Sequence, residues 1–262
     1  MKILKHLRSD WFHYGFETLA VVVGILIAFA LDNWNEDRKN EATEKEYITR
    51  LTYELKSDIQ YYKEIREKFI LKEERLKRIV VEWQSNKGYL SDSIQYINDY
   101  ISAGDIGPWY SEPGIWTQLI QTGELKLIRD QELIDDLFTY YNSVKKVADN
   151  FLMHPMEMTN KAREKWIQAF KYENPDSFFY FKANNIYELG EYERIPNKEM
   201  YERIWDERDE YLGLFITIAF NSMHQHQNLQ VIIELGQSLL VNLESKHLKH
   251  TSRQQSTKMT AI

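Results

Sequence analysis

Cysteine is absent from this sequence of 262 residues, and proline and glycine are scarce, with 5 and 10 residues. Without cysteine there are no disulfides, thiolate metal ligands or cysteine nucleophiles, which is compatible with either a cytoplasmic or a periplasmic location. A shortage of proline and glycine leaves few breaks in regular structure and favours long helices over many short strands. We therefore expect an all-α protein.

An excess of positive charge is also lacking, because 40 acidic residues outnumber 33 Lys and Arg and give a net charge of −7. General nucleic-acid binding needs a basic face that neutralises phosphates. The charge balance therefore argues against nucleic acid as a partner.

The common catalytic and cofactor motifs are missing: there is no GxSxG, no glycine-rich phosphate loop, no HExxH and no acidic calcium loop. His224 and His226 are two residues apart, whereas metal-binding pairs on a helix are three or four apart. The acidic pairs Asp135-Asp136 and Glu73-Glu74 indicate solvated helix faces. We expect a non-enzymatic protein with no catalytic residues, no cofactor and no metal site.

Long apolar runs are limited to one, from Thr18 to Leu31. Its 14 residues fall short of the roughly 20 needed to cross the hydrocarbon core. Extension to the flanking Trp11 and Trp34 gives a helix of about 24 residues and about 36 Å. Aromatic residues at both ends are typical of a spanning helix. We predict a transmembrane helix over residues 11–34, with Trp11 and Trp34 as interfacial anchors in the lipid bilayer.

Two alternatives to a membrane anchor are open. One is a buried core helix of a soluble protein, and the other is a cleaved signal peptide, because Ala28-Phe29-Ala30 has the small-x-small cleavage pattern. The stretch before the run is long for the charged n-region of a signal peptide and contains Asp10 and Glu17, and the helical pattern continues past Ala30.

Basic residues in front of the run predict a cytoplasmic N-terminus, although further basic residues after it reduce the contrast. The first group comprises Lys2, Lys5 and Arg8, and the second comprises Arg38, Lys39, Lys45 and Arg50.

A seven-residue apolar period follows Trp34 and predicts one long helix that packs along its length, on its own domain or on another copy. The repeated positions are Ile48, Leu55, Tyr62, Phe69, Leu76 and Trp83, with Leu51, Ile65 and Ile79 between them. Asp58 and Lys72 interrupt the pattern. From Trp11 to about Trp83 the chain would form a single rod of roughly 110 Å.

Shorter helices are expected after the rod. One follows Ser91 or Asp92. Another opens at Ser111-Glu112-Pro113 with Ser as N-cap and closes at Gly123, and the next is capped by Asp130 and interrupted at Pro155. A last helical region is expected from near Asn197 to about Leu248, with a break near Asn221.

The predicted domains are a cytoplasmic N-terminus (1–10), the transmembrane helix (11–34), a long heptad-patterned helix (35–86), a helical-bundle domain (87–250) and a flexible tail (251–262).

Three aromatic residues flank an irregular loop and are candidates for lining a ligand cleft: Trp109, Tyr110 and Trp116. Packing in the core of the bundle is the favoured alternative.

Glu17 is an ionisable residue at or inside the bilayer, where such residues usually face protein or water. It shares a helical face with Ala20, Gly24 and Ala28, and a stripe of small residues lets another helix approach closely. The face is therefore a candidate transmembrane interface. The alternative is that Glu17 extends to the headgroups.

Two blocks, "GFETLAVVVGILIAFALDNWNEDRKN" and "WTQLIQTGELKLIRDQELIDDLFTYY", together resemble a large family of uncharacterised bacterial membrane proteins that carry a domain of unknown function. In that pattern Gly directly precedes Glu, whereas Phe16 separates Gly15 from Glu17 here. The resemblance implies a single-pass envelope protein and brings no activity, substrate or catalytic residue.

Taken together, the sequence predicts a single-pass protein of the bacterial inner membrane with a cytoplasmic N-terminus and a periplasmic helical domain. It would act as an interaction, scaffold or sensor module, partnered by a second copy or another membrane protein. Two alternatives are a subunit of an ion- or proton-coupled complex that uses Glu17, and an envelope enzyme with a cleft at the aromatic loops.

Overall fold

The computed structural model describes residues 3–86, 93–107, 109, 113–170, 181–182, 191–192 and 198–259, with side chains placed for 15–86, 94–107, 109, 113–169, 199 and 201–245. The elements in chain order are α1 (Ile3–Ser85), α2 (Ser93–Ser102), α3 (Gly114–Thr122), the 3-10 turn η1 (Glu124–Leu127), α4 (Gln131–Met153), α5 (Pro155–Phe170), β1 (Phe181–Lys182), β2 (Glu191–Tyr192), α7 (Lys198–Asp206) and α8 (Arg208–Met259). The all-α prediction is confirmed, and within these ranges the antiparallel pair β1–β2 is a minor addition.

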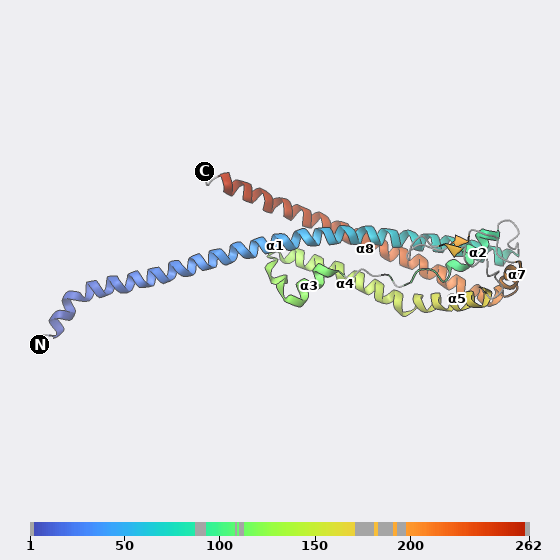
Figure 1. The fold of residues 1–262 in the computed structure, drawn as a ribbon, viewed down its shortest axis with the longest axis horizontal. Helices are drawn as coiled ribbons and strands as arrows, with labels where there is room; N and C mark the ends of the chain where they lie inside the picture. The colour runs from blue at the N-terminus through green and yellow to red at the C-terminus, as the bar shows by residue number, and fades with distance from the viewer. Residues whose placement is uncertain are drawn as a thin grey trace.

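Helix α1 runs without a break for 83 residues, which confirms the predicted rod. At 1.5 Å per residue it is about 125 Å long. Its first part projects from the bundle, and its second part forms one edge of the bundle (Figure 1). Asn86, with φ of 52°, follows its last turn.

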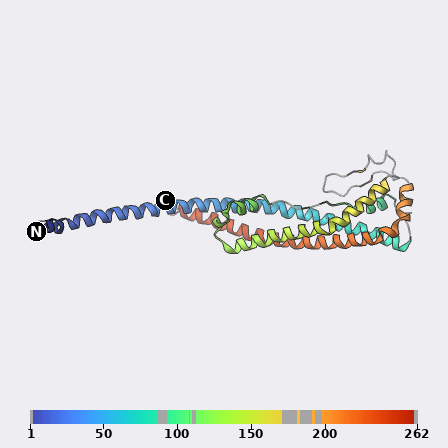
Figure 2. The ribbon, with the colours of Figure 1, turned by 90° about the horizontal axis from the view of Figure 1, so that it is seen from below.

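Helix α8 lies antiparallel to α1 and is its main packing partner (Figures 1 and 2). Lys56 pairs with Glu244, and further along Glu73 pairs with His226, which fixes the antiparallel register. The seven-residue pattern is the face of α1 that this packing buries. Its members are all buried: Ile48, Leu51, Leu55, Tyr62, Ile65, Phe69, Leu76, Ile79 and Trp83. The rod therefore packs on its own domain along this face.

The buried side chains form two clusters along the bundle. One lies nearer the projecting part of α1 and joins α1, α3, α4 and α8, and we call it the near core. The other joins α1, α2, α5, α7 and α8 at the opposite end, and we call it the far core. Figure 2 shows that α4 and α5 follow one another along the bundle. Accordingly, α4 packs in the near core and α5 in the far core.

Several predicted helix ends are confirmed. Gly123 ends α3 with φ of 69°, a left-handed conformation that glycine adopts at little cost. The Asp130 carboxylate accepts a hydrogen bond from the Leu133 amide at 3.0 Å and caps α4. Helix α4 ends at Met153 and α5 begins at Pro155, which has no amide hydrogen to continue the ladder.

The predicted start of α3 is wrong. The helix begins at Gly114 with Pro113 in the N-cap position, and Pro113 supplies no side-chain cap. The cap comes instead from Glu54 on α1, whose carboxylate accepts from the Ile115 amide at 2.7 Å. Ser111 and Glu112 lie outside the described residues. A cap from a residue 61 positions away leaves no local pattern.

The predicted break near Asn221 is also wrong, because the chain breaks at Glu207, between α7 and α8. Asn lowers helix propensity by only a few tenths of a kcal/mol. Burial of Ile218 and Leu229 on either side outweighs that cost. Helix α8 continues to Met259, past the predicted end at Leu248 and into the segment expected to be a flexible tail, which contains no glycine or proline.

Candidate functional site: the junction between anchor and bundle

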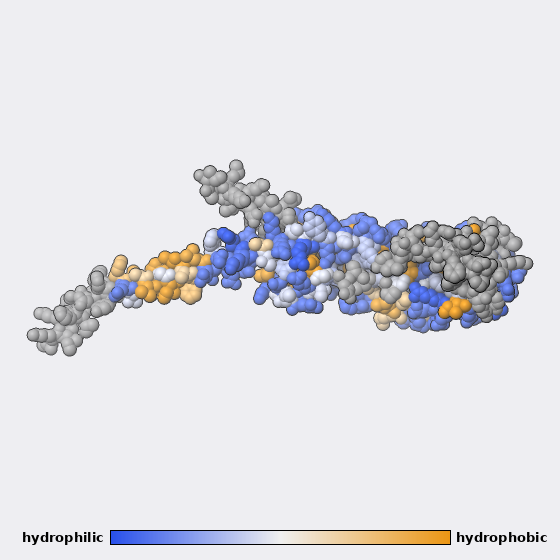
Figure 3. Space-filling view, in the orientation of Figure 1, coloured by the Kyte–Doolittle hydropathy of each residue, from blue (hydrophilic) through white to orange (hydrophobic). Residues whose placement is uncertain are grey.

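Every side chain of α1 from Gly15 to Lys39 is exposed, although most of those before Asp32 are apolar. Figure 3 shows this stretch as a band of hydrophobic surface beside the hydrophilic bundle. Within the described residues, α1 is the one helix long and apolar enough to cross a membrane. None of its apolar window is buried in the chain, which disfavours the core-helix alternative.

The candidate interface residues Glu17, Ala20, Gly24 and Ala28 are all exposed on this segment. A Cβ atom added at Gly24 would meet no described atom within 4 Å. Larger side chains at this position therefore fit the single chain.

Of the two predicted interfacial anchors, the structure describes the side chain of Trp34 but not that of Trp11. Trp34 is 61% exposed, and the Arg38 guanidinium lies 5.5 Å from its ring centroid. Trp11 lies in α1, and its side chain is outside the described residues.

Arg129, at the corner between η1 and α4, contacts the part of α1 that directly follows Trp34. Its backbone amide donates to the Glu44 carboxylate at 2.8 Å, and its guanidinium lies 3.4 Å from an Asp37 oxygen. Glu44 is buried and Asp37 is exposed, so the amide contact contributes more to stability than the surface pair. The two sequence blocks that carry the family resemblance meet here.

Tyr47 adds a second polar contact one turn further along α1. Its hydroxyl donates to Glu124 of η1 and accepts from the Gln118 amide at 3.2 Å. The bond with Glu124 raises the pKa of Tyr47 and lowers the pKa of Glu124. Both contacts hold the α3–η1 corner against the helix that leaves the bundle.

Glu54 completes the junction by joining three helices. Besides capping α3, it accepts a hydrogen bond from the Tyr141 hydroxyl of α4 at 3.1 Å. The Tyr141 ring stacks on Trp116 with centroids 4.9 Å apart and an interplanar angle of 15°. Sequence reasoning missed Glu54, because its partners lie 61 and 87 residues away and leave no local pattern.

The aromatic residues proposed for a cleft fill the near core. Trp109 is buried against Tyr62, with ring centroids 6.0 Å apart, and Trp116 is buried against Tyr141 and Phe138. Both positions match the core-packing alternative. Tyr110 lies outside the described residues.

Lys72 is a buried cation between the two cores. Its ammonium group donates to the Asp105 carbonyl at 2.6 Å and lies 3.5 Å from the Thr159 hydroxyl. Burial lowers the pKa of Lys72 to about 7, with Asp105 opposing the shift and Arg163 adding to it. Arg163 donates to the neighbouring Gly104 carbonyl at 2.6 Å. Lys72 and Arg163 therefore hold one loop through its backbone carbonyls. In the sequence, Lys72 is recognised only as an interruption of the heptads.

The prediction that Glu73 is solvated is wrong, because its side chain is only 9% exposed. The carboxylate lies 2.7 Å from Nε2 of His226 on α8 and pairs with Lys77. Burial alone would raise the pKa of Glu73, but these two partners outweigh it and lower the pKa.

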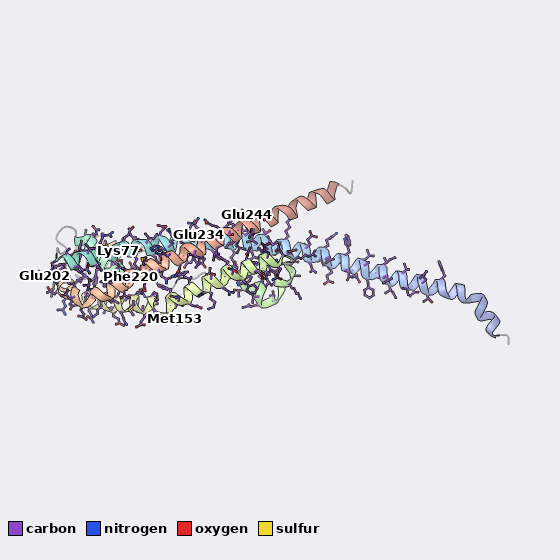
Figure 4. The ribbon with its side chains drawn as sticks, turned by 180° about the vertical axis from the view of Figure 1, so that it is seen from behind. Lys77, Met153, Glu202, Phe220, Glu234 and Glu244 are labelled. Atoms are coloured by element: carbon purple, nitrogen blue, oxygen red, sulfur yellow. The ribbon has the colours of Figure 1, made fainter. Side chains whose placement is uncertain are left out.

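The neighbouring surface between α1 and α8 carries Lys77 and Phe220 (Figure 4), and Phe220 is 59% exposed. Glu74 and Asp135 are exposed as predicted, whereas Asp136 is half-buried and accepts a hydrogen bond from Asn242 at 2.9 Å. His224 is exposed on α8. Among the described residues no group of three or more His, Asp or Glu is placed to hold a metal ion.

Comparison with known proteins adds one match. A model described as "Family of unknown function (DUF6090)" matches residues 17–102, which is about a third of the chain. The match covers most of α1 and all of α2. No curated protein and no solved structure matches the chain. Over its exposed apolar helix and the first helices of its bundle, the chain is thus similar to an uncharacterised family that has no assigned activity.

Proposed function

We propose that this chain is a non-enzymatic, single-pass membrane protein of the bacterial envelope that serves as an interaction, scaffold or sensor module. Residues 11–34 cross the inner membrane, the N-terminus lies in the cytoplasm and the helical bundle lies in the periplasm. The observation that supports this most directly is the continuity of α1. The same helix is exposed and apolar at one end and buried in the bundle at the other.

The junction contacts couple the membrane segment of α1 to the rest of the bundle. Arg129, Tyr47 and Glu54 fasten α3, η1 and α4 to α1 within the first turns of the bundle. A rotation or tilt of the anchor is therefore passed to the bundle as a whole. This coupling suits a module that reports on, or is positioned by, a partner in the membrane.

The orientation is tested by a reporter active only outside the cytoplasm, fused after Ile262 of the full chain. We expect activity, because the basic residues precede the apolar run. Activity only from a cytoplasmic reporter at the same position would contradict the orientation. Retention of an N-terminal tag on the mature protein separates an anchor from a cleaved signal.

We further propose that the anchor meets another transmembrane helix, most simply that of a second copy, through Glu17, Ala20, Gly24 and Ala28. Lipid tails give apolar helices little reason to associate, so small residues that allow close packing must supply the attraction. Gly24→Ile should reduce cross-linked oligomer in membranes, because the added side chain fits the single chain but blocks close approach.

Val22→Ile is the matched control, since Val22 lies on another face of the same segment and is also exposed. Equal cross-linking of both variants and the wild type would remove the interface. Glu17 would then be a residue that only extends to the headgroups.

A further inference from the structure

Positive charge is concentrated at the C-terminal end of α8. From Lys246 to Ile262 the chain has no Asp or Glu, and its basic residues are Lys246, Lys249, Arg253 and Lys258. The whole chain has a net charge of −7, so this segment opposes the charge of the rest. We call residues 246–258 the basic arm.

The fold brings the basic arm back toward the anchor. The Lys56 ammonium lies 2.7 Å from the Glu244 carboxylate, which places Glu244 level with Lys56 on the antiparallel helices. Beyond Glu244 (labelled in Figure 4), α8 remains helical to Met259. In Figure 1 this end of α8 separates from α1 and points to the side of the bundle from which the anchor projects.

The register gives the height of the arm above the bilayer. At 1.5 Å per residue, Lys258 lies about 21 Å past Glu244, which along a parallel axis is the level of about Ala42 of α1. Ala42 is about 12 Å from Trp34, the outer boundary of the proposed anchor. A headgroup layer takes up about 5–7 Å of that distance. For the tip of the arm the remainder is shorter than the Debye length of about 8 Å at physiological ionic strength, so a charge there acts on the phosphates. Lys246, at the other end of the arm, is level with about Glu54 and lies about 30 Å from Trp34.

We propose that the end of the basic arm, around Lys258, binds the headgroups of anionic phospholipids in the leaflet from which α1 emerges. This inference rests on the proposed single-pass anchor. It gives the bundle a second attachment to the bilayer, at a distance from α1, and so limits how far the bundle tilts. The stretch of α1 directly after Trp34 is a weak headgroup ligand in comparison, because Glu36, Asp37 and Glu41 outnumber Arg38 and Lys39 there. Those carboxylates are the rival partner for the arm.

The absence of cysteine allows a clean test with a single label. The full chain carrying Ser252→Cys is labelled with a donor fluorophore and reconstituted into vesicles that contain acceptor-labelled headgroups. Vesicles of phosphatidylcholine alone are compared with vesicles that also contain phosphatidylglycerol. We expect energy transfer to be higher in the anionic vesicles and to fall to the neutral-vesicle value at high salt.

The variant with Lys246, Lys249, Arg253 and Lys258 all changed to Gln should show the neutral-vesicle value in both lipids. The matched control changes four exposed lysines of the bundle to Gln and should keep the response: Lys63, Lys145, Lys146 and Lys161. Equal transfer in neutral and anionic vesicles would overturn the proposal, and it is the result expected if the arm packs on the acidic residues of α1 directly after Trp34. Co-flotation with neutral vesicles reads the anchor separately, and its failure would overturn the proposed function instead.

Discussion

Between Gly15 and Lys39 every side chain of α1 is exposed, whereas between Tyr47 and Trp83 a residue is buried every three or four positions. The backbone is the same continuous helix in both halves. Within the exposed half, the run from Thr18 to Leu31 is apolar on all sides and has no period. The buried half has a seven-residue period with charged residues between. The comparison shows that the sequence of a helix records its surroundings: no packing partner within the described chain in one part, and a single packed face in the other.

The largest expected effect is on the free energy of unfolding, when the same Leu→Ala substitution is made once in the buried half of α1 and once in the exposed half. Leu51→Ala removes a side chain that is 0% exposed in the near core and should lower the free energy of unfolding by about 2–5 kcal/mol. Leu26→Ala in the exposed half should leave unfolding of the bundle unchanged. Thermal denaturation of the full chain in detergent measures both, and similar losses would break the comparison.

A smaller effect concerns pH and the buried cation Lys72. Its pKa of about 7 in the folded chain lies below the value of 10.5 for an exposed lysine. The unfolded chain then binds more protons between these values, so stability should rise as the pH is raised above 7. Between pH 7 and 9 we expect a gain of about 1–3 kcal/mol.

Lys72→Met is the reference for this measurement, because it lacks the titrating group while other groups are shared. Chemical denaturation at pH 7, 8 and 9 should give a rising difference between wild type and variant. Parallel stability curves over that range would show that Lys72 keeps an ordinary pKa.

The smallest expected effect on the free energy of unfolding tests the contacts of Glu54 at the junction. Glu54→Ala removes the cap of α3 and the partner of Tyr141, and should cost about 1–2 kcal/mol. Glu46→Ala, at an exposed position on the same helix, should stay within about 0.5 kcal/mol of wild type. Equal effects would mean that the junction contributes no more than the surface of the bundle.

Much of the fold follows from local patterns. The apolar run and the heptads predict α1, and Gly123 and Asp130 mark helix ends because a left-handed glycine and a side-chain cap act over a few residues. The junction and the buried charges do not follow in this way. Glu54, Glu73 and Lys72 find their partners 61, 153 and 33 residues away. The sequence alone does not distinguish a buried charged residue from an exposed one, because the packing of the opposing helix decides which it is.

The unbroken helix also has a mechanical consequence. From Trp34 to Trp83 it is a stiff arm of about 74 Å. With the proposed membrane anchor in a bilayer, the far core would stand at about that height above it. A change of about 10° in the tilt of the membrane segment sweeps the far end sideways by about 13 Å. A lateral event within the bilayer is thereby converted into a displacement of molecular size at a fixed height, without any change in the structure of the bundle.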